Sequence, residues 1–366
     1  MIVWAALAAA GVAFFLAAAA TPLAARIAWA TGFVAQPTRD RYHRQPTPLL
    51  GGTAILLAIL MPSLFIMATA AIWNADPAGP PGWVPPELAV HIPGVVARTP
   101  MALGILAGAV VLHLVGLIDD RKRLGPVLKL SAQVAVACGV VLLGRVRLLE
   151  MYGRTFSTVA SICWIVLVTN ALNLLDNIDG LAAGVTAICA SALLAAAVSS
   201  GQLFVGGWLL LLAGASLGFL IHNFPPARVF MGDAGALVLG YLLAVLTILT
   251  TYYHGGPSGR YYGVFTPVVL LAVPLYDTAS VIVLRIRERR HPLVGDTRHF
   301  SHRLLRRGMS PRKTVLTIYL ATAATAAGAS LLPHVDRTGA MILFGQTVGI
   351  VLIIALLEST DGKRKR

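Results

Sequence analysis

The sequence has few charged residues and few cysteines for its length. Only 12% of its 366 residues are charged and 57% are hydrophobic, whereas soluble domains carry about 25% charged residues. This composition excludes an ordinary soluble globular protein. The three cysteines, Cys138, Cys163 and Cys189, each lie inside an apolar run. They therefore indicate neither a disulfide framework nor a metal site.

Long apolar runs recur along the whole chain, and each is about 20 residues long, the length that crosses a bilayer. They predict an all-α, polytopic integral membrane protein with about 11 transmembrane helices. No loop is long enough to bury a core of its own, so residues 1–366 are expected to form a single transmembrane domain. The first run lacks a preceding positive segment and is interpreted as an uncleaved span. The expected spans are residues 2–21, 50–73, 100–118, 127–144, 157–175, 179–199, 203–221, 234–253, 263–284, 314–332 and 339–357.

Acidic residues are scarce, 15 against 29 lysines and arginines, giving a net charge of +14. Twenty-three of the 29 basic residues fall on one side of the expected spans. By the positive-inside rule, this side is cytoplasmic, the N-terminus lies outside and the C-terminus lies in the cytoplasm. We therefore expect a multi-pass protein of the cytoplasmic membrane. No basic loop is interleaved with aromatics, so nucleic acid is not an expected partner. The cytoplasmic loops are residues 22–49, 119–130, 175–179, 222–232 and 285–313.

Five aspartates gather on this expected cytoplasmic side, whereas the opposite side has no comparable cluster. They are Asp119, Asp120, Asp176, Asp179 and Asp233. One-sided placement favours an interfacial active site for a charged, cytosolic substrate, because an ion pathway needs acids spread through the bilayer depth. A transporter is therefore disfavoured. The third hypothesis, after the interfacial active site and the transporter, is a membrane scaffold that has lost its activity. The presence of all five aspartates argues against it.

The segment 170–184, NALNLLDNIDGLAAG, holds two of these acids between apolar runs. If it is helical, Asn170, Asn173 and Asp176 fall on one side, three residues apart. Polar groups at membrane depth face a protein interior or a water-filled cavity and usually mark function. The alternative is a short polar loop between two spans.

The carboxylates suit a hard cation such as Mg²⁺, with Mn²⁺ as the alternative, because Mg²⁺ binds through one or two carboxylates and keeps water or phosphate as its other ligands. Asp119 and Asp120 are adjacent and cannot face the same way on a helix, so one can reach a metal while the other turns to a second group. His299 and His302 could form part of a zinc site, but no third ligand accompanies them. The imidazole and guanidinium groups of this basic loop fit the binding of a pyrophosphate better than the binding of zinc. Arg306 and Arg307 are interpreted as positive-inside or lipid-headgroup contacts.

Five motifs follow one another along nearly the whole chain: PTRDRYHRQPTPLLGG (37–52), GLIDDRKRLGP (116–126), NALNLLDNIDGL (170–181), VFMGDAG (229–235) and DTRHFSHRL (296–304). Taken together, they resemble the motifs of the polyprenyl-phosphate N-acetylhexosamine-1-phosphate transferases. The chain is more similar to the undecaprenyl-phosphate GlcNAc-1-phosphate transferase branch than to the ten-span phospho-MurNAc-pentapeptide transferases, whose activity is the alternative.

The resemblance implies transfer of HexNAc-1-phosphate, expected to be GlcNAc-1-phosphate, from a UDP-sugar to undecaprenyl or another polyprenyl phosphate with release of UMP. Such an enzyme depends on Mg²⁺ and starts lipid-linked glycan synthesis for the cell wall, lipopolysaccharide or teichoic acid. The implied partners are a UDP-N-acetylhexosamine, polyprenyl phosphate and membrane lipids. The resemblance is also compatible with a homodimer.

The resemblance also implies roles for individual residues. Asp233 is the expected principal metal ligand, and Asp119 and Asp120 are the expected base and metal-site carboxylates. Asp176 completes the expected catalytic set. The chain departs from the family pattern at Arg41, Asn177, Ala236 and Ser301; a histidine is common in place of Ser301. The resemblance implies that Asp179 faces the uracil of the donor and that Phe230 stacks on the uracil ring. The expected substrate-binding residues are His43, Asn173, Asp179, Phe230, Arg298, His299, His302 and Arg303.

Overall fold

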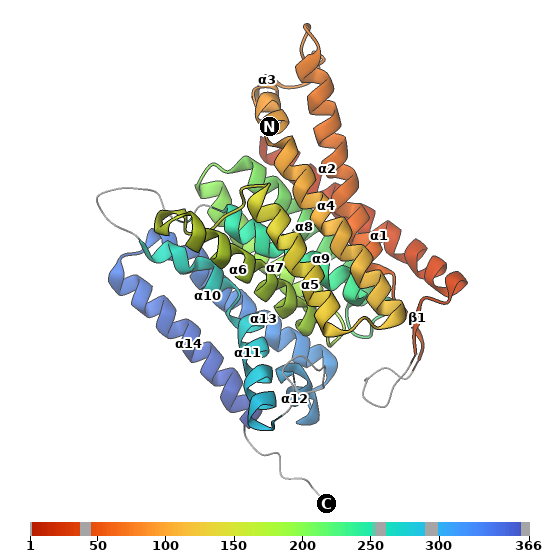
Figure 1. The fold of residues 1–366 in the computed structure, drawn as a ribbon, viewed down its shortest axis with the longest axis vertical. Helices are drawn as coiled ribbons and strands as arrows, with labels where there is room; N and C mark the ends of the chain where they lie inside the picture. The colour runs from red at the N-terminus through yellow and green to blue at the C-terminus, as the bar shows by residue number, and fades with distance from the viewer. Residues whose placement is uncertain (1, 37–44, 251, 253–260, 290–298, 360–366) are drawn as a thin grey trace, which may run out of the picture.

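A computed structural model describes residues 2–36, 45–250, 252, 261–289 and 299–359, and the chain is almost entirely helical within them (Figure 1). Nine of its helical segments are long and apolar enough to cross a membrane. They comprise α1 (Ile2–Thr31), α2 (Gly51–Ala75), α4 (Ile92–Lys122) joined to the short α3 (Pro86–Ala89), α6 (Arg154–Leu175), α7 (Leu181–Ser199), α8 (Leu203–Asn223), α9 (Gly232–Leu249), α13 (Pro311–Leu331) and α14 (Arg337–Ser359).

Two further helical units account for the remaining expected spans. Helices α10 (Thr266–Leu270) and α11 (Ala272–Arg287) form a pair bent by 64°, which counts as a tenth span if it crosses as one unit. Helix α5 (Pro126–Leu142) coincides with the expected span 127–144, but with 17 residues it is shorter than the other spans. The all-α, polytopic fold is confirmed. The orientation of the termini and the single-domain organisation stay predictions.

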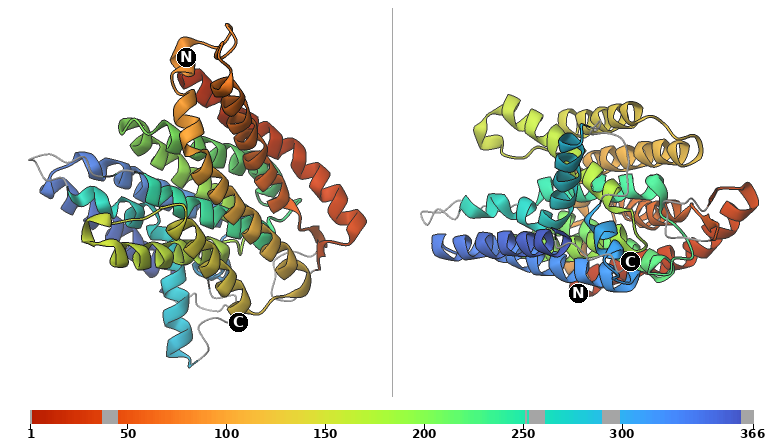
Figure 2. Two further views of the ribbon diagram at one scale, coloured as in Figure 1. Left: turned by 45° about the horizontal axis from the view of Figure 1, so that its top comes forward. Right: turned by 90° about the horizontal axis from the view of Figure 1, so that it is seen from below.

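Helix α9 lies at the centre of the bundle and packs against α2, α4, α6, α7 and α8 (Figures 1 and 2). Its apolar side chains are buried nearly all the way round, as expected for a helix surrounded by other helices. The peripheral helices α1 and α14 expose many large apolar side chains, such as Phe15 and Ile353. These faces fit contact with lipid chains. The first residues of α9 are therefore held by several helices at once.

Several helix boundaries differ from the expected ones. Helix α1 continues through Pro22 to Thr31 and so takes up the first part of the expected loop 22–49, where its alanine-rich sequence favours helix. Helix α4 begins at Ile92 and ends at Lys122, so Asp119 and Asp120 lie on its last turn rather than in a loop. The expected loop 285–313 contains helix α12 (Phe300–Arg306), and a short antiparallel pair, β1 (Val34–Ala35) and β2 (Thr47–Pro48), precedes α2.

Candidate active site

Two glycines allow α2 and α4 to approach the first turn of α9 closely. A Cβ added to Gly52 would lie 2.3 Å from the backbone nitrogen of Gly235, and one added to Gly116 would lie 2.4 Å from the backbone of Ala234. These distances are shorter than any real contact, so the backbones approach only because both positions lack a side chain. The buried His113 adds a hydrogen bond of 3.1 Å from its Nδ1 to the Ala234 carbonyl.

Asp120 caps the N-terminus of α9 from the end of α4. Its Oδ1 accepts the backbone N–H of Asp233 at 2.9 Å, and its Oδ2 accepts that of Ala234 at 3.2 Å. The first N–H groups of a helix have no partner within the helix and favour negative charge. The carboxylate therefore fixes the position of Asp233. The expected roles of Asp120 in catalysis and metal binding stay predictions.

Lys129, at the start of α5, places its ammonium group between two of the expected site carboxylates. Its Nζ donates to Asp119 Oδ2 at 2.7 Å and also to Asp233 Oδ2. The other oxygen of Asp233 accepts from Asn173 Nδ2 at 3.1 Å. Helices α4, α5, α6 and α9 thus each contribute one polar side chain to the same point, where a positive charge lies between two negative ones.

The donor set at this point fits a magnesium ion. Asp119 Oδ1 is buried and has no hydrogen-bond partner among the described residues, so one carboxylate oxygen is left available to a ligand. Within those residues, no group of three or more His, Cys, Asp and Glu side chains could hold a metal ion. Mg²⁺ needs only one or two protein carboxylates when water or phosphate supplies the rest. Asp119 and Asp233 are the residues that would hold it.

The segment 170–184 is open to two interpretations from the sequence, a helix or a polar loop, and it contains both: helix, then turn, then helix. Helix α6 ends at Leu175, residues 176–180 form a turn, and α7 begins at Leu181. Asn177 Nδ2 donates to the Leu174 carbonyl at 2.8 Å, and Gly180 has a φ of +73°. The side-chain bond of Asn177 satisfies a carbonyl of the last turn of α6, and the left-handed Gly180 immediately precedes α7. Half-buried Asp176 is the first residue beyond α6 and so stays near Asn173.

This turn is hydrogen-bonded to the segment that joins α8 to α9. Asp179 Oδ2 accepts the backbone N–H of Ala227 at 2.8 Å. The buried Asn223 accepts from the Gly180 backbone and donates to the Val229 carbonyl, both at 2.8 Å. The two segments expected to bind the uridine therefore meet.

Phe230, the residue expected to stack on uracil, is fixed through its backbone. Its N–H donates to the Pro48 carbonyl of β2 at 2.8 Å, and its carbonyl accepts from Gly51 N at 3.0 Å. Phe230 thus links the loop before α9 to the start of α2. The structure brings Asp179 and Phe230 to the same group of loops, while their contact with uracil stays a prediction.

Helix α12 carries the expected histidines, and a buried carboxylate of α11 holds its first turn. Asp277 Oδ2 lies 2.8 Å from His299 Nδ1, and its Oδ1 accepts the backbone N–H of Phe300 at 2.9 Å. The Asp277 side chain is fully buried, and only 4% of His299 is exposed. When Nδ1 carries the donated proton, the Nε2 atom of a neutral ring is an acceptor. His302 is half-buried on the same helix.

Two positions that depart from the family pattern contact each other. Ser301 Oγ donates to Asn177 Oδ1 at 2.5 Å, which attaches α12 to the 176–180 turn. Arg303 Nη2 donates to Ser280 Oγ at 2.8 Å and forms an ion pair of 2.7 Å with Glu358. Arg303 is thus engaged with α11 and α14, and its expected contact with substrate stays a prediction.

Comparison with known proteins identifies the family of the chain. Residues 102–251 match the model of glycosyl transferase family 4. The chain is 32% identical over 310 residues to the probable undecaprenyl-phosphate N-acetylglucosaminyl 1-phosphate transferase of Bacillus subtilis (strain 168), with 82% of this chain and 77% of the relative covered. It is 33% identical over 361 residues to the decaprenyl-phosphate N-acetylglucosaminephosphotransferase of Mycobacterium tuberculosis (strain ATCC 25618 / H37Rv), with 90% and 84% covered.

This chain belongs to the polyprenyl-phosphate N-acetylhexosamine-1-phosphate transferase family. A lower similarity, 27% over 237 residues and 61% of this chain, links it to the undecaprenyl-phosphate alpha-N-acetylglucosaminyl 1-phosphate transferase of Escherichia coli (strain K12), of which 64% is covered. The stretch that matches the family model includes Asp119, Asn173 and Asp233 but ends before α12. The resemblance inferred from the motifs is confirmed.

Two residues of this candidate site are not predicted from the sequence. The charge pattern identifies Lys129 only as one of many positive-inside charges. Asp277 lies inside an expected span, and an acid at membrane depth was the signal that could have identified it. Two expected substrate-binding residues, His43 and Arg298, lie outside the described residues, so their positions stay predictions.

Proposed function

We propose that this chain transfers N-acetylglucosamine 1-phosphate from UDP-N-acetylglucosamine to a polyprenyl phosphate and releases UMP. The names of the relatives support the sugar and the acceptor. The observation that carries the proposal is the convergence of Lys129, Asp119 and Asp233 on one point. A lysine ammonium group beside carboxylates that can hold a cation suits the transfer of a phosphate-linked group, because both positive charges can stabilise the phosphates.

In the proposed reaction, a phosphate oxygen of the polyprenyl phosphate attacks the β-phosphorus of the UDP-sugar. A new phosphorus–oxygen bond forms, and the bond from the β-phosphorus to the bridging oxygen breaks. UMP leaves with the bonding electron pair, and the product is a polyprenyl diphosphate sugar. The acceptor is a phosphate monoester with a second pKa near 6, so it is largely dianionic at neutral pH and needs little help from a base.

The residues then divide into those that face the phosphates and those that position them. Asp119 and Asp233 would hold Mg²⁺, which, when bound, neutralises negative charge on the phosphates. Lys129 supplies a second positive charge at the same point, and Asn173 orients Asp233. Asp120 positions the first turn of α9, because both of its oxygens accept backbone N–H groups there. Catalysis rests mainly on alignment and charge.

The nucleotide end of the donor is assigned to the loops beside this point. Asp179 and the segment of Phe230 are bound to each other by the hydrogen bonds of the turn. His299 and His302 on α12 would face the donor from the other side, with α12 attached to the turn through Ser301. We place this site at the cytoplasmic face of the cell membrane because 23 of the 29 basic residues lie on that side of the spans.

The test is UMP release by the purified, full-length protein with undecaprenyl phosphate. UDP-N-acetylglucosamine, UDP-N-acetylgalactosamine and UDP-MurNAc-pentapeptide are compared as donors, each with Mg²⁺, Mn²⁺ or EDTA. We expect release with UDP-N-acetylglucosamine, dependent on both the lipid and the divalent ion. A transporter of lipid-linked sugars would release no UMP with any donor. Preference for the pentapeptide donor would reassign the chain to the other branch.

A further inference from the structure

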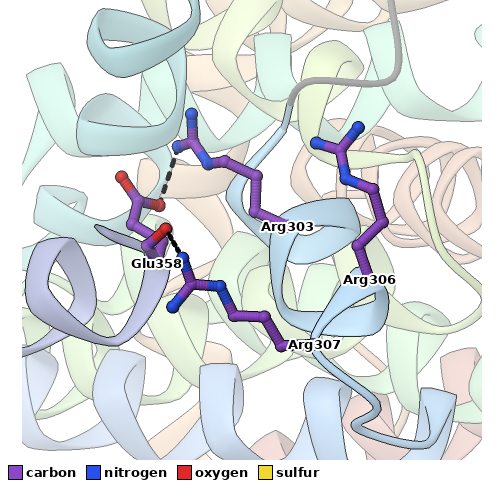
Figure 3. A pocket seen from close by; sticks show the side chains of 4 residues that line it. All are labelled: Arg303, Arg306, Arg307 and Glu358. Carbon is purple, nitrogen blue, oxygen red and sulfur yellow. Dashed lines mark hydrogen bonds and ion pairs between the residues drawn. The ribbon is translucent and has the colours of Figure 1, made fainter. Parts of the chain in front are cut away.

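A pocket of about 310 Å³ lies between helix α12 and the end of α14. It is lined by Arg303, Arg306, Arg307 and Glu358 (Figure 3). Three arginines against one glutamate give the lining an excess of positive charge. The proposed transfer reaction gives no role to Arg306 or Arg307, so the positive charge that they add to this pocket calls for a separate explanation.

Within the protein, the single acid and two of the arginines already have partners. Glu358 forms the ion pair with Arg303 and accepts the hydroxyl of Tyr276 at 2.6 Å. Arg307 donates to the backbone carbonyls of Leu357 and Glu358, which are otherwise without partners at a helix end. These contacts hold the pocket wall in place.

Arg306 is the arginine left available to a ligand. Its side chain is exposed and makes no ion pair or hydrogen bond with another residue in the described part of the chain. In Figure 3 it lies apart from the group that Arg303 and Arg307 form with Glu358. The guanidinium presents several N–H donors in a plane and is suited to bidentate binding of phosphate oxygens.

The pocket lies at the membrane edge. The apolar span of α14 runs from Arg337 to Glu358, and its 22 residues extend about 33 Å at about 1.5 Å per residue, close to the thickness of a bilayer core. Glu358 is therefore at the level where the hydrocarbon ends. The last turns before the pocket expose large apolar side chains: Leu352, Ile353, Leu356 and Leu357.

We propose that this pocket binds the phosphate group of an anionic membrane lipid whose chains lie along the last turns of α14. The exposed leucines and isoleucine would contact the chains, and Arg306 would bind the phosphate with support from the positive wall. Basic pockets between membrane helices near the headgroup level recognise anionic lipid headgroups in this way. A free phosphate ion would use the same guanidinium but would gain nothing from the apolar residues.

The test measures retained lipid on delipidated, full-length protein by native mass spectrometry. Dioleoylphosphatidylglycerol, dioleoylphosphatidylcholine and inorganic phosphate are titrated separately. Four proteins are compared: wild type, Arg306→Gln, Arg306→Lys and a control, Arg26→Gln, which removes an exposed arginine near the end of α1. Lipid retention requires no turnover, so the result is independent of the proposed transfer reaction.

We expect phosphatidylglycerol to bind wild type and the control equally, and better than phosphatidylcholine. Removing one basic residue near a membrane surface costs about 1 kcal/mol, so Arg306→Gln should weaken this binding about fivefold. Arg306→Lys keeps the positive charge but lacks the planar guanidinium group, so its affinity for phosphatidylglycerol should lie between those of wild type and Arg306→Gln. Equal binding by Arg306→Gln and wild type would overturn the proposal. Inorganic phosphate that competes as well as the lipid at equal concentration would overturn it too.

Discussion

Asp277 and His299 are joined by a buried hydrogen bond of 2.8 Å, although 22 residues separate them in the chain. The same carboxylate accepts the first backbone N–H of α12, from Phe300. One side chain thus fixes both the start of the helix and the ring orientation of its N-terminal histidine. A charged side chain buried completely is costly unless it is paired in this way, so the pairing is a specific feature of the site.

We expect Asp277→Asn to lower turnover roughly tenfold, a loss typical of removing a carboxylate that orients a functional histidine. The amide can still accept from the Phe300 N–H, but its NH₂ group now faces Nδ1 and favours the tautomer with the proton on Nε2. The fold is kept while the ring presents the wrong atom. The measurement is kcat and KM for UMP release.

The matched control for Asp277 is Ser280→Ala, one turn further along α11. It removes a contact of Arg303 and leaves His299 untouched. It should retain nearly full turnover. Equal losses in the two variants would mean that α12 only needs general support from α11 and that the His299 tautomer has no separate role.

Asp233→Asn should reduce turnover roughly a hundredfold, the loss typical of removing a preorganised electrostatic group. It should also raise the Mg²⁺ concentration needed for half-maximal rate, because one of two carboxylate ligands is gone. Lys129 keeps its ion pair with Asp119, so the protein should still fold and insert. An exposed aspartate at the far end of α2, Asp76, provides the control substitution Asp76→Asn. An unchanged rate and metal requirement would remove Asp233 from the ligand set.

The adjacent aspartates of α4 should respond differently to the same substitution. Asp120→Asn places an amide NH₂ against backbone N–H groups and should destabilise the fold by about 1–3 kcal/mol, seen as a lower Tm. Asp119→Asn leaves those bonds intact and should lower turnover with little change in Tm. The comparison separates a positioning residue from one that faces the phosphates. A stable Asp120→Asn variant with full activity would contradict the role of Asp120 as the cap of α9.

Gly116→Ala should destabilise the protein by about 1–3 kcal/mol, the usual cost of overpacking. The added methyl group meets the backbone of Ala234 and pushes α4 away from the first turn of α9. Gly104 lies on the same helix with open space around it, so Gly104→Ala should be neutral or slightly stabilising. Thermal unfolding of both variants gives the comparison. If the two Tm values agree, the close approach of α4 and α9 is not needed for stability.

The sequence predicts the helices of this fold well because a lipid environment imposes a length and a composition on every span. All eleven expected spans coincide with helices in the described residues. The ends are less predictable: α1 continues through Pro22 and α4 through Pro100 beyond their expected spans, although a proline usually signals a helix boundary. After Leu175 the side chain of Asn177 bonds to the last turn of α6, and the left-handed Gly180 precedes α7, whereas the pattern of polar residues also fits a continued helix.

The site is predictable as a set of acids but not as a set of contacts. The topology brings Asp119 and Asp233 to the same end of the bundle, and the structure agrees. Lys129 can lie between these two carboxylates only because the connection between α4 and α5 is tight, and the apolar pattern does not specify that connection. The pairing of Asp277 with His299 depends on where the chain returns after leaving α11, and such long-range geometry has no local signal in the sequence.

The last prediction concerns the route of transfer. We favour direct attack of the polyprenyl phosphate on the UDP-sugar, as a single displacement. The rival is a double displacement through a phosphorylated aspartate, for which Asp119 and Asp120 are the candidates. Asp120 is a poor nucleophile because both of its oxygens accept backbone hydrogen bonds. Asp119 has a free oxygen but shares its charge with Lys129.

The two routes differ when the lipid is withheld. A single displacement releases no UMP from enzyme and UDP-N-acetylglucosamine alone, because no acceptor is present. A double displacement releases one equivalent in a burst and leaves the sugar phosphate on the protein. Rapid-quench measurement of UMP, with intact-protein mass spectrometry of delipidated enzyme, distinguishes these results. We expect neither a burst nor a mass increase. A stoichiometric burst that Asp119→Asn abolishes would establish the covalent route instead.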